Sequence, residues 1–242
     1  MQSRDRLIVA LDRSSRDDIL RLADQLHGVA GALKIGLQAF VGNGPSIVRE
    51  IIGRGERVFL DLKIHDIPNT AQHAVAEAAA LGAAMVTVHA AGGEAMMRAC
   101  APSPGLRPPS PASGRGAGGE GLLVLGVTVL TSLDEAGLQR IGFRGTPVEN
   151  SVRLARLAQS SGLRGVVASP QEIAAIREAC GGELVIVTPG IRPAGSDAGD
   201  QRRTTTPAAA IAAGADYIVV GRPITDARDP RAAASELADS LP

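Results

Sequence analysis

The chain has 242 residues, 45% of them hydrophobic and 21% charged, a length that allows one large α/β domain or two small ones. Lysine and arginine together number 25, as do aspartate and glutamate, and aromatic residues make up only 2%, so we expect binding to neither nucleic acid nor membrane. The first residues lack a signal-peptide pattern, no apolar run reaches membrane-spanning length, and Cys100 and Cys180 lack metal-site spacing. These features predict a soluble, cytoplasmic protein with buried free thiols.

Apolar, strand-like runs alternate with helical patterns along the whole chain. Strands are expected at residues 7–11, 32–36, 58–60, 85–89, 122–129, 166–169, 184–188 and 217–220, and the clearest helices at 15–26, 38–53, 71–81 and 230–241. Eight strands, each followed by a helix, predict a single α/β domain over residues 1–242, a (β/α)8 TIM barrel. A doubly wound open sheet is the alternative, but no Gly-x-Gly-x-x-Gly opens the first helix.

One segment departs from this alternation. Residues 102–121 are dense in Pro, Gly and Ser and carry few charges. Such a composition cannot form a packed element, so it predicts a flexible surface insertion between the fourth helix and the fifth strand. Because this junction enters a strand, it belongs to the face opposite the usual active-site end, and we expect it to be tolerated without a function.

The third strand ends in a group of charges of mixed sign. Asp61 and Lys63 stand two residues apart, so alternation along a strand predicts that they face the same way. Asp66 follows where the chain leaves the strand, and Pro68 suits the first turn of the next helix. Burying such charges is costly unless they are paired. A structural ion pair is the simplest interpretation, and the other strand ends decide against it.

In a barrel of this kind the chemistry lies where strands end and helices begin. Those positions hold Asp12, Lys34, Asp61, Lys63, His89, Thr131, Ser169, Arg192, Gly221 and Arg222. Lysines and aspartates converging on one barrel mouth predict an active site, whereas His89 is as readily a structural histidine. No combination of His, Cys and carboxylates has metal-ligand spacing, so we predict no metal.

The loops after the seventh and eighth strands indicate a phosphate site. Arg192 and Gln201 stand in a long polar loop rich in Gly, Ser and Asp, and Gly221 and Arg222 end the eighth strand. Glycine lets backbone N–H groups approach an anion, and arginine binds phosphate with a planar fork. We therefore expect a phosphorylated small molecule, held by a loop that closes over it.

These residues together resemble the orotidine 5′-phosphate decarboxylases of the bacterial type. The motifs that carry the resemblance are Val-Ala-Leu-Asp ending at Asp12, Leu-Lys-Ile-Gly ending at Gly36, the ten residues 61–70, and the segments 127–132, 188–193, 199–203 and 221–223. The resemblance implies removal of CO₂ from orotidine 5′-phosphate to give UMP, the last step of de novo pyrimidine nucleotide synthesis, without cofactor or metal. It also implies a homodimer with shared active sites.

The resemblance implies a role for each matching residue. Lys63 corresponds to the proton donor to C6 of the pyrimidine, and Asp61 lies against the substrate carboxylate. Lys34 and Asp66 of the partner subunit complete the charged catalytic network with them. The implied substrate-binding residues are Asp12, Lys34, Asp61, Thr70, Thr131, Arg192, Gln201, Gly221 and Arg222, with Thr70 reaching across the dimer interface and the last four holding the phosphate.

Two alternatives remain open. One is a Mg²⁺-dependent sugar-phosphate decarboxylase or aldolase of the same suprafamily, which shares an Asp-x-Lys-x-x-Asp signature. Such enzymes carry an acidic ligand after the second strand, where this sequence reads Lys34-Ile35-Gly36-Leu37-Gln38. The other is a non-catalytic nucleotide-binding relative, which loss of Lys63 or Asp61 would have favoured; both residues are present.

Overall fold

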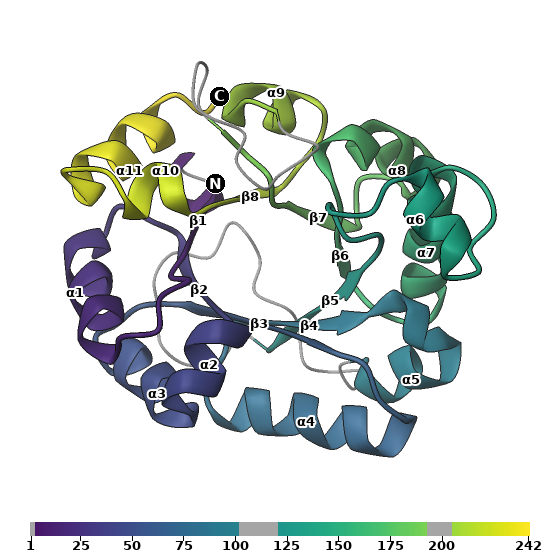
Figure 1. Cartoon of the computed structure of the whole chain (residues 1–242), viewed down its shortest axis with the longest axis horizontal. Coiled ribbons are helices and arrows are strands. Elements are labelled where there is room, and N and C mark those ends of the chain that lie inside the picture. Colours follow the sequence, from purple (N-terminus) through teal and green to yellow (C-terminus); the bar gives the residue numbers. More distant parts are fainter. Residues whose placement is uncertain (1–2, 102–120, 193–204) are drawn as a thin grey trace.

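A computed structural model describes residues 3–101, 121–192 and 205–242. Parallel strands form a closed barrel in chain order, with β1 pairing with both β2 and β8 (Figure 1). The strands are β1 (Leu7–Ala10), β2 (Ala32–Gly36), β3 (Val58–Ile64), β4 (Met85–His89), β5 (Leu123–Val127), β6 (Gly165–Val167), β7 (Val185–Thr188) and β8 (Tyr217–Val220). The predicted (β/α)8 barrel is confirmed.

Helices surround the barrel on its outside (Figure 1). They are α1 (Arg16–Leu26), α2 (Leu37–Asn43), α3 (Pro45–Gly53), α4 (Pro68–Ala80), α5 (Gly93–Cys100), α6 (Glu135–Arg140), α7 (Pro147–Ser160), α8 (Ile173–Cys180), α9 (Pro207–Ala212), α10 (Arg222–Thr225) and α11 (Pro230–Asp239), with short 3₁₀ turns η1 (Ser3–Arg6), η2 (Ala90–Gly92) and η3 (Pro170–Glu172). None of the helices in the described ranges is both long and apolar enough to cross a membrane.

Several helices begin where the sequence supplies a capping side chain or a proline. The side chains of Ser15, Thr146 and Asp229 accept backbone N–H bonds at the starts of α1, α7 and α11. Pro68 begins α4, as predicted, because the missing N–H of proline is not needed in a first turn.

The prediction of a single helix over residues 38–53 is wrong. The chain breaks there into α2 and α3 at Gly44, whose φ of 67° lies in the left-handed region, and Pro45 starts the second helix. Glycine adopts this conformation without steric cost and proline cannot continue a helix, so the Gly-Pro pair separates the two. The break places the short α2 directly after the end of β2.

Two apolar layers hold the fold together. The layer between barrel and helices is built from residues such as Val9, Leu33 and Leu60. The layer inside the barrel contains Ile8, Ala32 and Phe59, among others, from alternate positions on the same strands. Inward-facing positions recur every second residue along a strand. The inward-facing positions nearest the carboxyl ends of the strands therefore provide residues of the site described below.

Two sequence predictions concern other parts of this frame. Cys100 and Cys180 are both buried and free, as expected, and burial raises the pKa of the Cys100 thiol to about 11. The segment 102–120 lies outside the described residues, between the end of α5 and the start of β5. Its interpretation as a flexible insertion, and that of residues 1–242 as a single domain, therefore stay predictions.

Candidate active site

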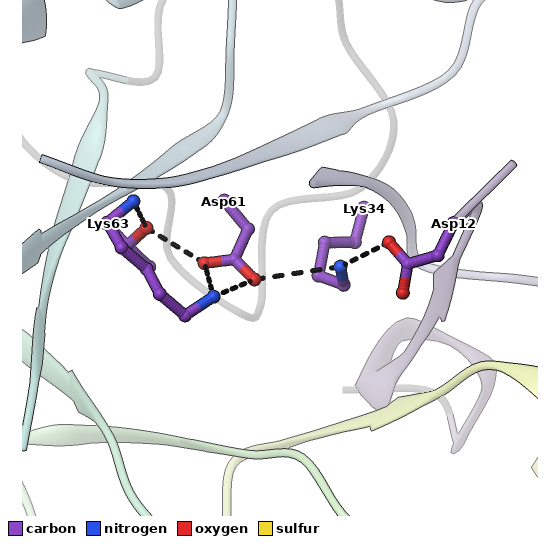
Figure 2. A network of polar contacts seen from close by, with 5 residues as sticks. Asp12, Lys34, Asp61 and Lys63 are labelled. Carbon is purple, nitrogen blue, oxygen red and sulfur yellow. Dashed lines mark hydrogen bonds and ion pairs between the residues drawn. The ribbon is translucent and has the colours of Figure 1, made fainter. Parts of the chain in front are cut away.

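Four side chains of alternating charge form a continuous chain at the carboxyl ends of β1, β2 and β3 (Figure 2). Lys63 Nζ lies 2.9 and 2.8 Å from the two carboxylate oxygens of Asp61. The Oδ2 atom of Asp61 lies 3.6 Å from Lys34 Nζ, which in turn donates to Asp12 Oδ1 at 3.0 Å. The lysines and aspartates that the sequence assigned to different strand ends therefore meet in one array.

Asp61 is the buried centre of this array. Its side chain is 12% exposed, against 31% for Lys63 and 52% for Asp12, so the array runs from the interior outward at both ends. Burial by itself raises the pKa of Asp61, but the charges of Lys34 and Lys63 and hydrogen bonds from Lys63 and Thr87 outweigh it and hold the pKa below its ordinary value. Asp61 is thus an ionised carboxylate at neutral pH.

The backbone at Lys63 has an unusual conformation. Its φ is 52°, and no other non-glycine residue in the described ranges has a positive φ. Pairing with β4 is interrupted here, because Leu60 pairs with Val86 and Ile64 with Val88. Strand alternation, on which the sequence prediction depended, is therefore the wrong reason for the meeting of Asp61 and Lys63. An irregularity in β3 turns Lys63 back onto its neighbour, the kind of backbone strain that concentrates at functional sites.

Gly36 leaves the space that the array needs. It ends β2 opposite Asp61 in the strand register. A Cβ atom at this position would lie 2.9 Å from Asp12 Oδ1 and 3.0 Å from Lys34 Nζ, too close for either to stay in place. The absent side chain, and not an unusual backbone angle, is what the site requires here.

The array forms one wall of a cavity of about 520 Å³ at the barrel mouth. The predicted site residues that line it are Asp12, Lys34, Asp61, Lys63, Thr131, Arg192, Gly221 and Arg222. Apolar side chains, including Phe59, Val127 and Val219, cover other parts of the wall. A cavity with apolar walls and a few converging charges is typical of a small-molecule site.

Two arginines contribute to the cavity from the other side of the barrel. Arg192 follows β7 and Arg222 follows β8, and in an eight-strand ring β7 stands opposite β3. The backbone N–H of Arg192 donates to the carbonyl of Thr205 at 3.0 Å, which ties together the two ends of the segment 193–204. Gln201, the fourth predicted phosphate ligand, lies in this segment, outside the described residues.

Asp66 and Thr70 do not line the cavity of their own chain. Both are exposed at the start of α4, together with Ile67, whose side chain is 66% exposed. The Oδ1 atom of Asp66 accepts the backbone N–H of Ile67 at 2.7 Å, which fixes the carboxylate at this surface. The predicted roles of these two residues thus require a second subunit.

The two remaining strand-end candidates also lie off the cavity wall. Ser169 is fully buried, and the ring of the half-buried His89 lies 5.4 Å from that of His65. Burial, followed by the charges of His65 and Lys63, lowers the pKa of His89 and so keeps it neutral. These contacts agree with a structural histidine.

Sequence reasoning missed Thr87 and Arg13. Thr87 is fully buried in β4, where its hydroxyl contacts both Asp61 and the backbone of Lys63. Arg13 lines the cavity and donates to the carbonyl of Thr225 at 3.1 Å, joining the loops after β1 and β8. A polar residue among apolar neighbours in an inner strand was the available signal for Thr87.

Comparisons with known proteins identify the family of this chain. The family model described as orotidine 5′-phosphate decarboxylase / HUMPS family matches residues 5–237. The chain belongs to this family. It is 51% identical over 242 residues to an orotidine 5′-phosphate decarboxylase of Moorella thermoacetica, covering 100% of this chain and 94% of the relative. The corresponding protein of Vibrio parahaemolyticus is 49% identical over 98% of this chain and 97% of its own length.

A solved structure of an orotidine 5′-phosphate decarboxylase is similar to this one. The crystal structure of the decarboxylase from Lactobacillus acidophilus superimposes with a TM-score of 0.81 at 35% identity, covering 96% of this chain and 97% of that one. Within the ranges that the structure describes, no group of three or more His, Cys, Asp or Glu side chains could hold a metal ion. The carboxylates of the array are instead paired with lysines.

Proposed function

We propose that this protein decarboxylates orotidine 5′-phosphate to UMP, the last step of de novo pyrimidine nucleotide synthesis, without cofactor or metal. The observation that carries the proposal is the chain of alternating charges in the cavity wall, in which Lys63 contacts the buried Asp61. Relatives that are about half identical to this chain along nearly their whole length are named orotidine 5′-phosphate decarboxylase.

The chemistry requires charge that is in place before the reaction begins. The bond from C6 of the pyrimidine to the carboxylate carbon breaks, its electron pair stays on C6, and CO₂ leaves. The ammonium of Lys63 stabilises the developing carbanion and transfers a proton to C6, and Lys63 then regains a proton from solvent. The two contacts from Asp61 hold this ammonium in position before the substrate arrives.

The rest of the cavity supplies binding. We assign the ribose hydroxyls to Asp12 and Lys34, the pyrimidine to Thr131 and the phosphate to Arg192, Gly221 and Arg222, all of which line the cavity. Gln201, which lies outside the described residues, is proposed as a further phosphate ligand. Arginine at the far side of the barrel mouth suits a phosphate that is separated from the reacting carbon by a ribose. Binding energy from this remote group is available to organise the site for the transition state.

A homodimer is part of the proposal. Asp66 and Thr70 are exposed and lie away from the cavity of their own chain, and the apolar Ile67 between them is exposed too. In a symmetric dimer the same surface of each subunit meets its counterpart. These residues can then complete the site of the neighbouring subunit, where Asp66 joins the charged array and Thr70 the substrate contacts.

The Mg²⁺-dependent sugar-phosphate activity of the suprafamily is the weaker candidate. Lys34 stands at the end of β2, where those enzymes carry an acidic ligand, and its ammonium pairs with both Asp12 and Asp61. A divalent cation placed between these carboxylates would be repelled by this ammonium at close range. A non-catalytic nucleotide-binding protein is disfavoured because Lys63 is held against Asp61 in a strained backbone that binding alone does not require.

An absorbance assay tests the reaction. Wild-type protein is mixed with orotidine 5′-phosphate in EDTA, and the loss of substrate absorbance is followed together with the appearance of UMP. Turnover that EDTA does not affect is expected. No turnover with tight UMP binding would indicate the non-catalytic relative, and no turnover without UMP binding would direct the search to sugar phosphates with Mg²⁺.

Mixing two inactive variants tests the shared site. Lys63→Ala in one subunit and Asp66→Ala in the other leave a hybrid dimer with one intact site, since the intact Lys63 then meets the intact Asp66 of the partner subunit. A one-to-one mixture after subunit exchange is expected to recover about a quarter of the wild-type activity, because half of the dimers are hybrids with one working site. A mixture that stays inactive despite exchange would contradict the shared site.

The cytoplasmic location stays a prediction.

A further inference from the structure

We propose that Thr87 is a positioning residue for catalysis: its single hydroxyl fixes both the carboxylate of Asp61 and the strained backbone that presents Lys63. The inference rests on the proposed function and extends it to a residue of β4 that does not line the cavity. Thr87 is fully buried, so its hydroxyl has no access to bulk water.

The hydroxyl uses both of its hydrogen-bonding capacities within the array. It donates to Asp61 Oδ1 at 2.9 Å and accepts the backbone N–H of Lys63 at 2.8 Å. The second bond matters because strand pairing lapses between Leu60 and Ile64, where the ladder is irregular. A side chain thus holds the backbone N–H at the point where β3 departs from regular pairing.

The two bonds depend on each other. A hydroxyl has one proton, so when that proton points at Asp61 the oxygen lone pairs face the amide of Lys63. An ionised carboxylate accepts hydrogen bonds only, which fixes this orientation. Thr87 therefore couples the charge state of Asp61 to the backbone conformation that places the ammonium of Lys63 against the same carboxylate. A small displacement of a reacting group is costly for the rate, whereas phosphate binding on the far side of the barrel does not depend on it.

The groups facing Asp61 determine how this coupling can be detected. Lys34 faces it from β2 and Lys63 from β3, Asp12 lies beyond Lys34, and the charge of Asp61 acts on His89 in β4. The hydrogen bond from Thr87 is among the influences that lower the pKa of Asp61. Removing the hydroxyl alone, with every charge retained, therefore raises that pKa and moves the acidic limb of the kcat profile to higher pH.

The test compares Thr87→Val, which removes the hydroxyl at nearly constant volume, with Thr87→Ser, which retains it. Thr128→Val is the matched control, since this buried threonine donates to the carbonyl of Val167 at 2.9 Å and does not line the cavity. For each variant kcat, KM, the pH dependence of kcat, UMP affinity and thermal unfolding are measured. If the valine variant does not fold, Thr87→Ala carries the same prediction.

We expect Thr87→Val to lower kcat roughly 100-fold while KM and UMP affinity change little, because the loss is one of geometry at the reacting centre. Its acidic limb should move to higher pH, and Thr87→Ser should recover most of the rate. A kcat no lower than that of Thr128→Val, an unmoved acidic limb, or failure of serine to recover the rate would each overturn the inference. No turnover by the wild-type protein would overturn the proposed function and this inference with it, whereas an active wild type matched by Thr87→Val overturns this inference alone.

Discussion

Charged side chains form a cluster at each end of the barrel. The two clusters differ in their hydrogen-bond partners, which are mainly backbone groups in one cluster and side chains in the other. At the amino end, Arg177 of α8 donates to the carbonyls of Gly181 and Leu184 at 3.0 and 2.7 Å, and to the carboxylate of Asp216 at 2.8 Å. The same oxygen of Asp216 accepts the backbone N–H of Ile186 at 2.8 Å. Arg177 and Asp216, which we call the amino-end clamp, therefore join the start of β7, the start of β8 and the end of α8.

At the carboxyl end the contacts run from side chain to side chain. Lys63, Asp61, Lys34 and Asp12 contact one another in sequence and line the cavity. Lys63 has a left-handed backbone conformation there. Among the described residues, no non-glycine residue of the amino-end clamp has such a strained conformation. Charges tied to backbone groups stabilise a fold, whereas charges tied to one another beside a cavity, on a strained backbone, are arranged for chemistry.

The largest expected effect is at Lys63. Lys63→Ala removes both the stabilising charge and the proton, so we expect turnover of orotidine 5′-phosphate to fall about 10⁴-fold or more. UMP binding should survive, because the phosphate contacts lie on the far side of the barrel. Steady-state kinetics and calorimetric titration with UMP check both statements. If the variant keeps its rate within about tenfold of wild type, Lys63 is not the proton donor.

The opposite result is expected at the amino-end clamp. Arg177→Ala removes the cation paired with the partly buried Asp216 and a donor to the carbonyls of Gly181 and Leu184, and should lower the free energy of unfolding by about 2 kcal/mol with kcat unchanged. Arg98→Ala is the control, since Arg98 forms an exposed pair with Glu94 and should change stability by less than about 0.5 kcal/mol. Urea unfolding and the decarboxylation assay distinguish the two roles. A large loss of kcat in a folded Arg177→Ala would contradict the comparison.

Gly36→Ala tests the space beside the array. Its Cβ would displace Asp12 or Lys34, so kcat/KM should fall roughly 10- to 100-fold, with little loss of stability since the added methyl group meets flexible side-chain ends. Gly53→Ala, where a Cβ meets nothing within 4 Å at the end of α3, should leave activity intact and stabilise by up to about 1 kcal/mol. Equal activities of the two variants would show that the array tolerates displacement.

The smallest effect concerns acid stability. The pKa of Asp61 lies below its ordinary value in the folded protein despite burial, because the charges of Lys34 and Lys63 and the hydrogen bonds from Lys63 and Thr87 favour the carboxylate. A depressed folded-state pKa contributes stability that is fully present above the unfolded-state value and is lost as the pH falls through the folded-state value. Wild type should therefore lose stability relative to Asp61→Asn below about pH 4. Unfolding curves between neutral and acidic pH measure this, and a wild-type advantage that grows on acidification would contradict it.

The sequence was sufficient to predict the barrel and most of the residues of the candidate site, because residues at the carboxyl ends of parallel strands meet at one mouth. Asp12, Lys34, Asp61 and Lys63 were all found this way. The break between α2 and α3 was missed although Gly44 and Pro45 are recognised helix breakers.

Other features depend on contacts between strands. Thr87 acquires its role from the register of β4 against an irregular β3, and Gly36 from the position of side chains on two neighbouring strands. The left-handed conformation of Lys63 is likewise a product of pairing and of its contacts. A single chain read residue by residue carries no record of such pairing, so these contacts could not be predicted, even where a polar residue among apolar neighbours marks Thr87 itself.

The most direct test of the central claim is a crystal structure with UMP bound. The account predicts that C6 of the pyrimidine lies within about 3.5 Å of Lys63 Nζ, the distance at which a proton can be transferred. It also predicts the phosphate against Arg192 and Arg222. A nucleotide bound with its phosphate beside Lys63, or with its base outside the cavity, would contradict the assignment of the charged array to decarboxylation.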